Sequence, residues 1–378
     1  MPSSREVIDA IIRRRPAARV GVNDSPWGDT LRQWVTQGMP ADKEGKPVDV
    51  VEHFGFDMAG VGGWFDIMPK PGAKEVIEET SEWRVVRNGA GAVLKWWKSK
   101  SGTPEHIDFA MTSREIWDRD YRPHLAGPFD RARLGDLDAA RERLARRKDQ
   151  GLWTFFGHLF IWEAMRASMG DYTMYMSLIE DPQWIHDYAR VYTDLYKTAF
   201  GILLKEVGSP DGIWIYEDLG YKGSLFCNPK LLEELIFPYY HELVEFFHSF
   251  KLPVVLHTCG FTEPALDLIV AAGFDALNPM EAKAGNDALR IAKGYGDRLA
   301  FVGGLDARIL ESSDRDLIRR GVTDLVEGMK RLGASYVFGS DHSVSTNVRY
   351  DDFRFALDVY RQHYCGCVYS LNQPAHED

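Results

Sequence analysis

The chain has 378 residues, of which 45% are hydrophobic and 27% charged, and this composition excludes a disordered chain. At about 150 residues per domain, the length fits one large α/β barrel with an insertion, or two medium domains. The 45 Lys and Arg residues against 56 Asp and Glu residues give a net charge of −11. Because no basic block is available to follow a phosphate backbone, we expect no nucleic-acid partner.

Cysteine content and hydropathy indicate the compartment. Four cysteines in a chain of this length do not form the framework of a secreted disulfide-rich protein. No segment approaches the roughly 18 to 20 apolar residues of a membrane span, and no apolar stretch follows the basic N-terminus as in a signal peptide. We therefore expect a cytoplasmic protein with no membrane partner. Cys365 and Cys367 are interpreted as exposed thiols near the chain end, with no assigned role.

Short apolar runs followed by Gly, Asp or His recur along the chain. In chain order, the predicted strands are 19–22, 54–61, 153–157, 212–218, 253–259, 274–278, 299–303 and 335–339. Apolar residues spaced three and four apart predict helices at 229–250, 263–272, 314–332 and 350–364. Alternation of strands and helices predicts a parallel sheet. Eight such strands predict an α/β fold, a single (β/α)8 TIM barrel.

The N-terminal part of the chain is longer than a barrel requires. A barrel of this type takes about 250 residues, which leaves about 128 of the 378, mostly between about 62 and 150. Apolar and polar residues alternate over 83–97 as in a β-hairpin, with Asn88-Gly89 as its turn. The charged residues of 131–149 predict a solvated helix. We see no flexible linker. The expectation is one domain over 1–378, with the N-terminal part elaborated by this β-hairpin insertion.

Polar residues that follow the predicted strands are candidates for the active site, because barrel enzymes build it at the C-terminal ends of the strands. These are Asn23, Asp24, Asp57, His158, Glu217, Asp218, His257, Cys259, Asn278, Asp306, Asp341 and His342. Such a set predicts a polar barrel mouth that suits a metal ion.

His257 and Cys259 form the sharpest local motif. Residues two apart on an extended segment point the same way, and imidazole with thiolate suits zinc. Taken alone, the motif fits a core histidine and a small buried cysteine equally well. A second donor cluster, Asp341 and His342, favours the metal because strand ends of a closed barrel converge. We predict a catalytic zinc held by His257, Cys259 and His342, with Asp341 or Glu217 as replacement ligands or supporting partners.

Several longer segments resemble the uroporphyrinogen decarboxylase superfamily. They are LHTCGFTEPALDLIVAAGFDALNPMEAKAG, YGDRLAFVGGLDARIL and YVFGSDHSVSTNVRYDDFRFAL, preceded in the expected order by RPAARVGV, HFGFDMAG, GHLFIWEAMRASMGDYTMYMSLIEDP and IWIYEDLGYKGSLFCNPKLLEELIFPYYHELVEF. The resemblance covers nearly the whole chain. It implies a single (β/α)8 barrel, in agreement with the strand count.

The resemblance is closer to one branch of that superfamily. True uroporphyrinogen decarboxylases carry an arginine-rich block of the form R-Q-A-G-R-Y, whereas residues 20–27 contain no arginine. A charge of −11 would also repel an anionic porphyrinogen. The other branch, the corrinoid-linked methyltransferases, binds zinc through a His-x-Cys pair and a distant cysteine. His257 and Cys259 match the pair, and His342 falls at the position of the distant cysteine.

This resemblance implies a zinc-dependent methyltransferase that moves a methyl group between a small-molecule substrate and a corrinoid protein. Replacing a thiolate by an imidazole leaves zinc a stronger Lewis acid, so we do not carry over the thiol substrate, coenzyme M. The chain lacks the D-x-H-x-x-G corrinoid signature, which places cobalamin on a separate partner protein. Relatives in the family often form homodimers.

Roles for the remaining candidates follow from their expected place at the mouth. Glu217 and Asp218 would orient substrate or act as acid and base, or else cap a neighbouring helix. His158 is a substrate contact or a structural histidine, and Asp57 and Asp306 contact ligand or cap helices. The expected substrate-binding set is Asp57, His158, Tyr221, Asn278, Asp306 and Asp341.

Two other functions stay open. One is a decarboxylase or lyase that uses Asp57, Asp218 and His342 without a metal. The other is a barrel without turnover that binds a corrinoid or tetrapyrrole as a carrier or sensor.

Overall fold

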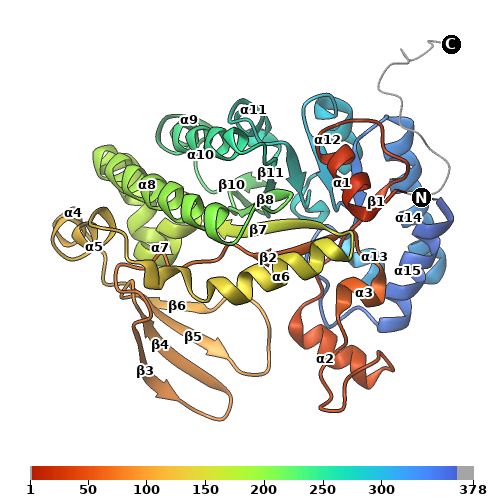
Figure 1. Ribbon diagram of the computed structural model, residues 1–378, viewed down its shortest axis with the longest axis horizontal. Coiled ribbons are helices and arrows are strands. Elements are labelled where there is room, and N and C mark those ends of the chain that lie inside the picture. Colours follow the sequence, from red (N-terminus) through yellow and green to blue (C-terminus); the bar gives the residue numbers. More distant parts are fainter. Residues whose placement is uncertain (1, 364–378) are drawn as a thin grey trace.

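Figure 1 shows the computed structural model of the protein, which describes residues 2–363; Cys365 and Cys367 lie outside them. Its centre is a curved sheet of eight strands in which every neighbouring pair is parallel. The strands are β1 (Gly21–Val22), β2 (Met58–Gly62), β7 (Trp153–Leu159), β8 (Gly212–Tyr216), β11 (Val254–His257), β12 (Ala276–Asn278), β13 (Ala300–Val302) and β14 (Tyr336–Phe338). All eight predicted strands are confirmed.

The sheet order closes the strands into a barrel. The order of hydrogen-bonded strands is β1-β14-β13-β12-β11-β8-β7-β2. From β2 to β14, each barrel strand therefore pairs with the next barrel strand along the chain, and β1 and β2 lie at the two ends of this order. The backbone N–H of Asp57 donates to the carbonyl of Val22 over 2.8 Å and joins these two ends. The predicted (β/α)8 barrel is therefore confirmed.

Helix α1 (Ser4–Ile12) covers the N-terminal end of the barrel. It begins with a capping box between Ser3 and Glu6, and its apolar face buries Val7, Ile8, Ile11 and Ile12. The helix contacts β1, β2, β7, β13 and β14. One end of the barrel is thereby sealed, which leaves the C-terminal ends of the strands as the open mouth.

The remaining helices surround the barrel. They are α2 (Gly28–Thr36), α3 (Val50–Phe54), α6 (Leu137–Asp149), α7 (Ile161–Glu180), α8 (Pro182–Glu206), α9 (Pro229–Leu235), α10 (Phe237–Ser249), α11 (Leu266–Ala271), α12 (Ala288–Tyr295), α13 (Ala307–Glu311), α14 (Arg315–Arg331) and α15 (Tyr350–His363). The helix expected over 229–250 is interrupted at Ile236, because Pro238 lies in the first turn of α10 and proline disfavours helix continuation through the preceding residues. Within residues 2–363, no helix is both long and apolar enough to cross a bilayer.

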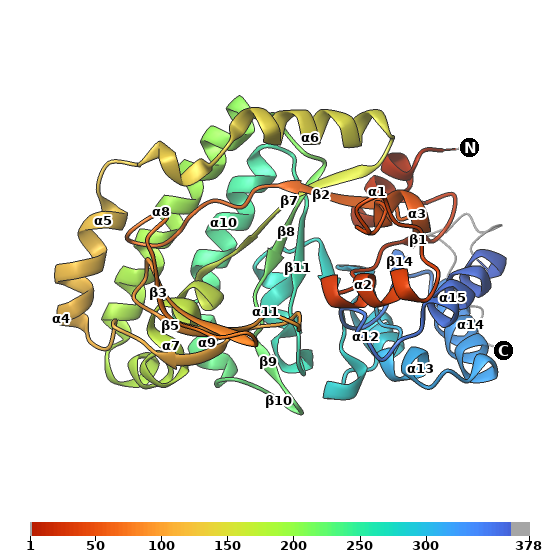
Figure 2. The same cartoon turned by 90° about the horizontal axis from the view of Figure 1, so that it is seen from below.

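The insertion contains a second sheet. Strands β3 (Lys74–Glu79), β4 (Trp83–Asn88), β5 (Val93–Trp97) and β6 (Glu105–Asp108) pair antiparallel in that order, followed by α4 (Arg114–Ile116), the π-helix η1 (Trp117–Tyr121), α5 (Arg122–Ala126) and the 3-10 helix η2 (Arg131–Leu134). Figure 2 shows the sheet on one side of the barrel, near α4, α5 and α7. The predicted hairpin is β4–β5, and its turn is longer than Asn88-Gly89, because the Asn88 side chain accepts hydrogen bonds from Ala90 and Ala92.

Candidate functional site

Three side chains meet where β8 and β11 end at the mouth. His257 is the last residue of β11 and lies opposite Tyr216 of β8 and Asn278 of β12. Its Nε2 lies 3.4 Å from the Cys259 Sγ and 3.8 Å from an Asp218 carboxylate oxygen. Among residues 2–363, these three form the one group of at least three His, Cys, Asp or Glu side chains whose ligand atoms all lie within 4.8 Å. We call Asp218, His257 and Cys259 the donor group.

Glycines and backbone hydrogen bonds hold Cys259 in place. Gly260 has φ +80°, and a Cβ there would overlap the backbone of Gly220 in the hairpin formed by β9 (Gly220–Tyr221) and β10 (Ser224–Leu225). The Cys259 N–H donates to Asp218 over 3.0 Å, and the Gly260 N–H donates to Glu281 over 2.8 Å. The loop after β11 therefore packs closely against the loop after β8.

Asn278 orients the imidazole of His257. Its amide nitrogen donates to the carbonyl of Val302 over 3.0 Å, so its carbonyl oxygen faces the His257 Nδ1 at 2.5 Å. This arrangement requires the proton of a neutral His257 on Nδ1 and leaves the Nε2 lone pair directed at Cys259 and Asp218. Metal-binding histidines are commonly held in this way by a second hydrogen bond.

The electrostatics of the donor group favour a bound cation. Burial lowers the pKa of His257, although Asp218 opposes this, and neutral imidazole is the form that binds metals. Burial and the nearby carboxylates of Asp218 and Glu281 raise the pKa of the Cys259 thiol well above its usual value. A divalent cation would supply the positive charge that a thiolate needs here. One sulfur, one nitrogen and one oxygen donor fit zinc.

The donor group lies between two cavities. An inner cavity of about 220 Å³ at the mouth is lined by His257, Asn278 and His342, with Tyr216 among its aromatic walls. An outer cavity of about 450 Å³ is lined by Cys259 together with Tyr221, Lys222, Glu281, Lys283 and Arg308. Cys259 therefore faces one cavity and His257 the other.

His342 lies at the mouth but outside the donor group. It lines the inner cavity with His257, and its Nδ1 lies 3.3 Å from the carbonyl of Ser343. Asp218, expected as an acid or base, occupies the place beside His257 and Cys259 where His342 was expected. The predicted role of His342 as third zinc ligand stays a prediction.

The side chain of Glu217 caps the N-terminus of helix α7. Its side chain is fully buried, and one oxygen accepts from the N–H groups of Phe160 and Glu163, the other from Trp162 and the Tyr240 hydroxyl. These backbone donors belong to the start of α7, where the helix dipole favours a carboxylate, although burial raises the pKa of Glu217 to about 8. Glu217 thus points away from the donor group, and the geometry favours capping over catalysis.

Asp57 does not follow a strand at the mouth, and that expectation is wrong. It precedes β2, which begins at Met58, because residues 50–54 form helix α3 and the strand starts later than the apolar run suggests. Asp57 is buried at the N-terminal end of the barrel, where it pairs with Arg19 at 2.6 Å and accepts from Ser4 and the Val22 N–H.

Asp306 and Asp341 organise the loops around the mouth. Asp306 caps α13 through the Arg308 N–H and pairs with the Arg308 guanidinium at 2.6 Å. Asp341 is buried and accepts from the N–H groups of Ala282 and Ala307 over 2.7 and 2.8 Å, which joins the loops after β12 and β13.

Tyr221 is exposed at the outer cavity.

His158 lies in an apolar environment beside the mouth. Its ring packs on Trp64 and Phe65, and its two nitrogens lie 3.1 Å from the carbonyls of Phe65 and Leu159. Burial lowers the pKa of His158 to about 4, so the ring is neutral at physiological pH. It lines a separate cavity of about 240 Å³, and this environment is typical of a structural histidine.

Glu163 and Arg166 were missed by the sequence interpretation. They pair at 2.7 Å in the first turns of α7, and Arg166 also binds Asp171 at 2.9 Å. Burial and the charge of Asp218 raise the pKa of Glu163 to about 7, so its carboxyl can exchange a proton near neutral pH. The signal was available, because α7 follows β7 and its N-terminus must therefore lie at the mouth.

Comparisons with known proteins agree with this architecture. The profile of the uroporphyrinogen decarboxylase (URO-D) family matches residues 171–363, just over half of the chain. A solved methyltransferase from Methanosarcina mazei is similar with 13% identity and a TM-score of 0.63, covering 96% of this chain and 99% of that one. An AP endonuclease of family 2 from Brucella melitensis aligns with 12% identity over 56% of this chain and 80% of its own, and its TM-score of 0.31 is too low to indicate a common fold.

No curated protein matches the sequence significantly. The family profile covers β8 through α15 and thus the segments that carry Asp218, His257 and Cys259. The chain belongs to the uroporphyrinogen decarboxylase (URO-D) family.

Proposed function

We propose that the protein is a methyltransferase that moves a methyl group between a small molecule in the inner cavity and a corrinoid protein. The donor group would hold a catalytic zinc ion. Cobalamin would be carried by the partner, as the sequence resemblance implies. The overall similarity to the Methanosarcina mazei methyltransferase supports the fold required for this reaction.

The observation that carries the proposal is the place of the donor group between two cavities. The inner cavity, about 220 Å³, has a volume suited to a small molecule, whereas the outer cavity beside Cys259 is about twice as large. Group transfer between a small substrate and a large partner needs a reacting centre that both can approach. The donor group meets this requirement, because His257 lines one cavity and Cys259 lines the other.

Hydrogen bonds within the chain hold and orient the donor group. Asn278 fixes the His257 ring, and the Cys259 and Gly260 N–H groups hold the carboxylates of Asp218 and Glu281 in the adjoining loops. Tyr216 stacks on Trp64 and packs against His257, and it forms part of the aromatic wall of the inner cavity. When bound, zinc would act as a Lewis acid on the heteroatom of the methyl donor or acceptor.

The alternative decarboxylase has less support. It requires Asp57, Asp218 and His342 to act together, but Asp57 is paired with Arg19 at the sealed end of the barrel. Asp218 and His342 lie at the opposite, open end. The set therefore does not form one site.

Metal content tests the proposal first. Purified protein loaded with zinc and then desalted should retain about one zinc per chain by elemental analysis, and the Cys259→Ser variant should lose it. The matched control is Cys227→Ser, which changes the other free cysteine of residues 2–363 and should retain the metal. Folded protein that binds no zinc would exclude the proposal.

Methyl transfer is then measured with free cob(I)alamin in place of the partner and a panel of methyl ethers and methylamines. Formation of methylcobalamin, followed by absorbance, should depend on zinc and be abolished in Cys259→Ser but not in Cys227→Ser. Zinc-loaded protein that binds cobalamin without any turnover would favour a carrier or sensor instead.

A further inference from the structure

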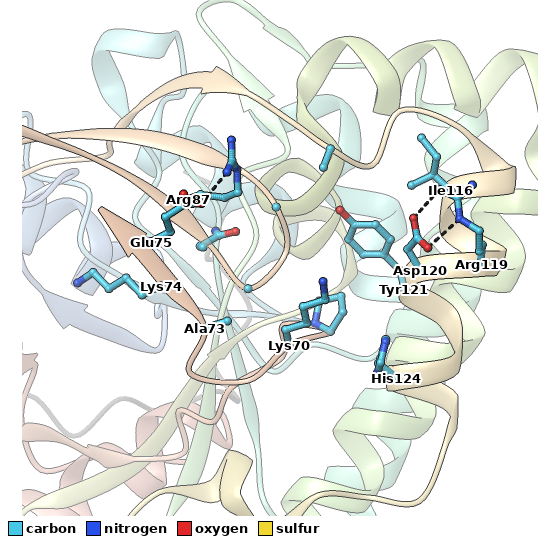
Figure 3. Close-up of a pocket in the computed structure, with 15 residues that line it drawn as sticks. Lys70, Ala73, Lys74, Glu75, Arg87, Ile116, Arg119, Asp120, Tyr121 and His124 are labelled. Atoms are coloured by element: carbon cyan, nitrogen blue, oxygen red, sulfur yellow. Dashed lines mark hydrogen bonds and ion pairs between the residues drawn. The ribbon is translucent and has the colours of Figure 1, made fainter. Parts of the chain in front are cut away.

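A cavity of about 640 Å³ lies in the insertion, away from the donor group (Figure 3). One wall is formed by β3, β4 and the loop before β3, and the other by α4, η1 and α5. It shares no lining residue with the inner or outer cavity. The cavity is therefore a feature separate from the proposed active site.

Its charged lining is unbalanced. The lining contains two lysines, two arginines and one histidine, but only two carboxylates. Each carboxylate is already in an ion pair: Glu75 with Arg87 at 2.6 Å and Asp120 with Arg119 at 2.7 Å. Figure 3 shows Lys70 between these two pairs. Within residues 2–363, Lys70 and Lys74 form no ion pair. In a protein of net charge −11, this is a local excess of positive charge.

The floor of the cavity is held by close backbone contacts. Gly89 leaves no room for a side chain because a Cβ would overlap the carbonyl of Lys70. Gly91 has φ +76°, and a Cβ there would lie 2.8 Å from the Tyr121 hydroxyl, which donates to the Ala90 carbonyl over 2.8 Å. The sheet turn, the loop before β3 and the helical wall are thereby fixed together, so the cavity is preformed.

The helical wall has an unusual backbone. Residues Trp117–Tyr121 form a π-helix, a rare conformation that occurs frequently at functional sites. This segment supplies Arg119, Asp120 and Tyr121 to the cavity. Its presence at the charged cavity is an observation independent of the charge excess.

We propose that this cavity binds a small organic oxyanion, a carboxylate or phosphate carried on an apolar body. Lys70 and Lys74 would hold the anion, since among the lysines and arginines of the lining they are the two that form no ion pair with a lining carboxylate. The apolar body would pack against Ile116 and Tyr121 on the opposite wall. The site does not depend on the methyltransferase activity.

Isothermal titration calorimetry on the full chain tests this at low ionic strength. Phenyl phosphate and benzoate supply the two anions on one apolar body, inorganic phosphate supplies charge alone, and phenol supplies the body alone. We expect one saturable site, tightest for phenyl phosphate or benzoate, that weakens with added salt. The stronger of these two ligands identifies the preferred oxyanion.

Variants locate the binding. Lys70→Gln and Lys74→Gln should each weaken binding about tenfold, and the matched charge change Lys43→Gln, at an exposed lysine outside every cavity described here, should not. Thermal unfolding of each variant checks that it folds. Absence of binding by both anionic probes, or equal binding by the Lys70→Gln/Lys74→Gln double variant, would overturn the proposal.

Discussion

The amide of Asn278 faces His257 with its oxygen and the Val302 carbonyl with its nitrogen, over 2.5 and 3.0 Å. A flip of this amide would place its oxygen against the Val302 carbonyl oxygen, which can only accept, and its nitrogen against the His257 Nδ1–H, which donates. The orientation is therefore determined by Val302, in the neighbouring strand, and the tautomer of His257 follows from it. A buried residue of β12 thus prepares a side chain of β11 for metal binding.

Asn278→Leu should weaken zinc binding about tenfold or more, the usual effect of losing such a supporting hydrogen bond. Asn278→Asp keeps an acceptor for His257 and should therefore reduce zinc affinity less than Asn278→Leu does. Competition with a chelator of known affinity measures both. Equal affinities in the two variants and the wild type would contradict an orienting role for Asn278.

Asp218→Asn and His342→Gln distinguish the two candidates for the third ligand. The distances around His257 place Asp218, and not His342, in the donor group. Asp218→Asn should therefore reduce zinc affinity by tenfold or more, whereas His342→Gln should retain the metal and change substrate affinity in the inner cavity. Zinc loss confined to His342→Gln would instead support the ligand set expected from the sequence.

The barrel could be predicted from sequence because its strands are short apolar runs buried on both faces, such as Val254–His257. Strands β3 and β6 could not be predicted from the sequence, because all of their residues are exposed and no hydrophobic alternation marks them. His257 and Cys259 were predictable because residues two apart on a strand share a direction.

The partner of that pair was not predictable. Asp218 reaches Cys259 only because the β9–β10 hairpin packs its Gly220 against Gly260, a contact between loops that no periodicity reveals. The separation of Glu217 from Asp218 follows a simpler rule. Adjacent residues leaving a strand point to opposite sides, so one carboxylate caps α7 and the other faces the mouth.

Glu217→Gln should destabilise the fold by about 3 kcal/mol, because the new amide nitrogen cannot accept hydrogen bonds and leaves buried donors unpaired. Urea unfolding measures the effect. The control is Glu233→Gln, an exposed glutamate of α9, which should change stability by less than about 0.5 kcal/mol. A similar small change at Glu217 would show that the α7 cap is dispensable.

The contact of Glu242 with Arg190 and Lys197 joins α10 to α8 and predicts a pH-dependent part of the stability. The two cations hold the pKa of Glu242 at about 2, and Lys197 lies at 2.9 Å. A lowered carboxyl pKa stabilises the folded state above the unfolded value of about 4.5 and stops doing so as the pH falls toward 2. Because these side chains are about one-third exposed, solvent screening limits the contribution to about 1 kcal/mol.

Glu242→Gln should therefore lose about 1 kcal/mol of unfolding free energy at pH 7, and the difference from wild type should shrink between pH 4.5 and pH 3. Urea unfolding at pH 7, 5 and 3.5 measures this, with Glu245→Gln as a control on the same helix. Among residues 2–363, the ion pairs of Glu245 comprise the one with His241 at 3.3 Å, in which both side chains are more than half exposed. Solvent screening makes such a pair weak, so the Glu245→Gln variant should show little effect. A deficit for Glu242→Gln that stays constant with pH would mean that packing of the side chain, and not its charge, joins the two helices.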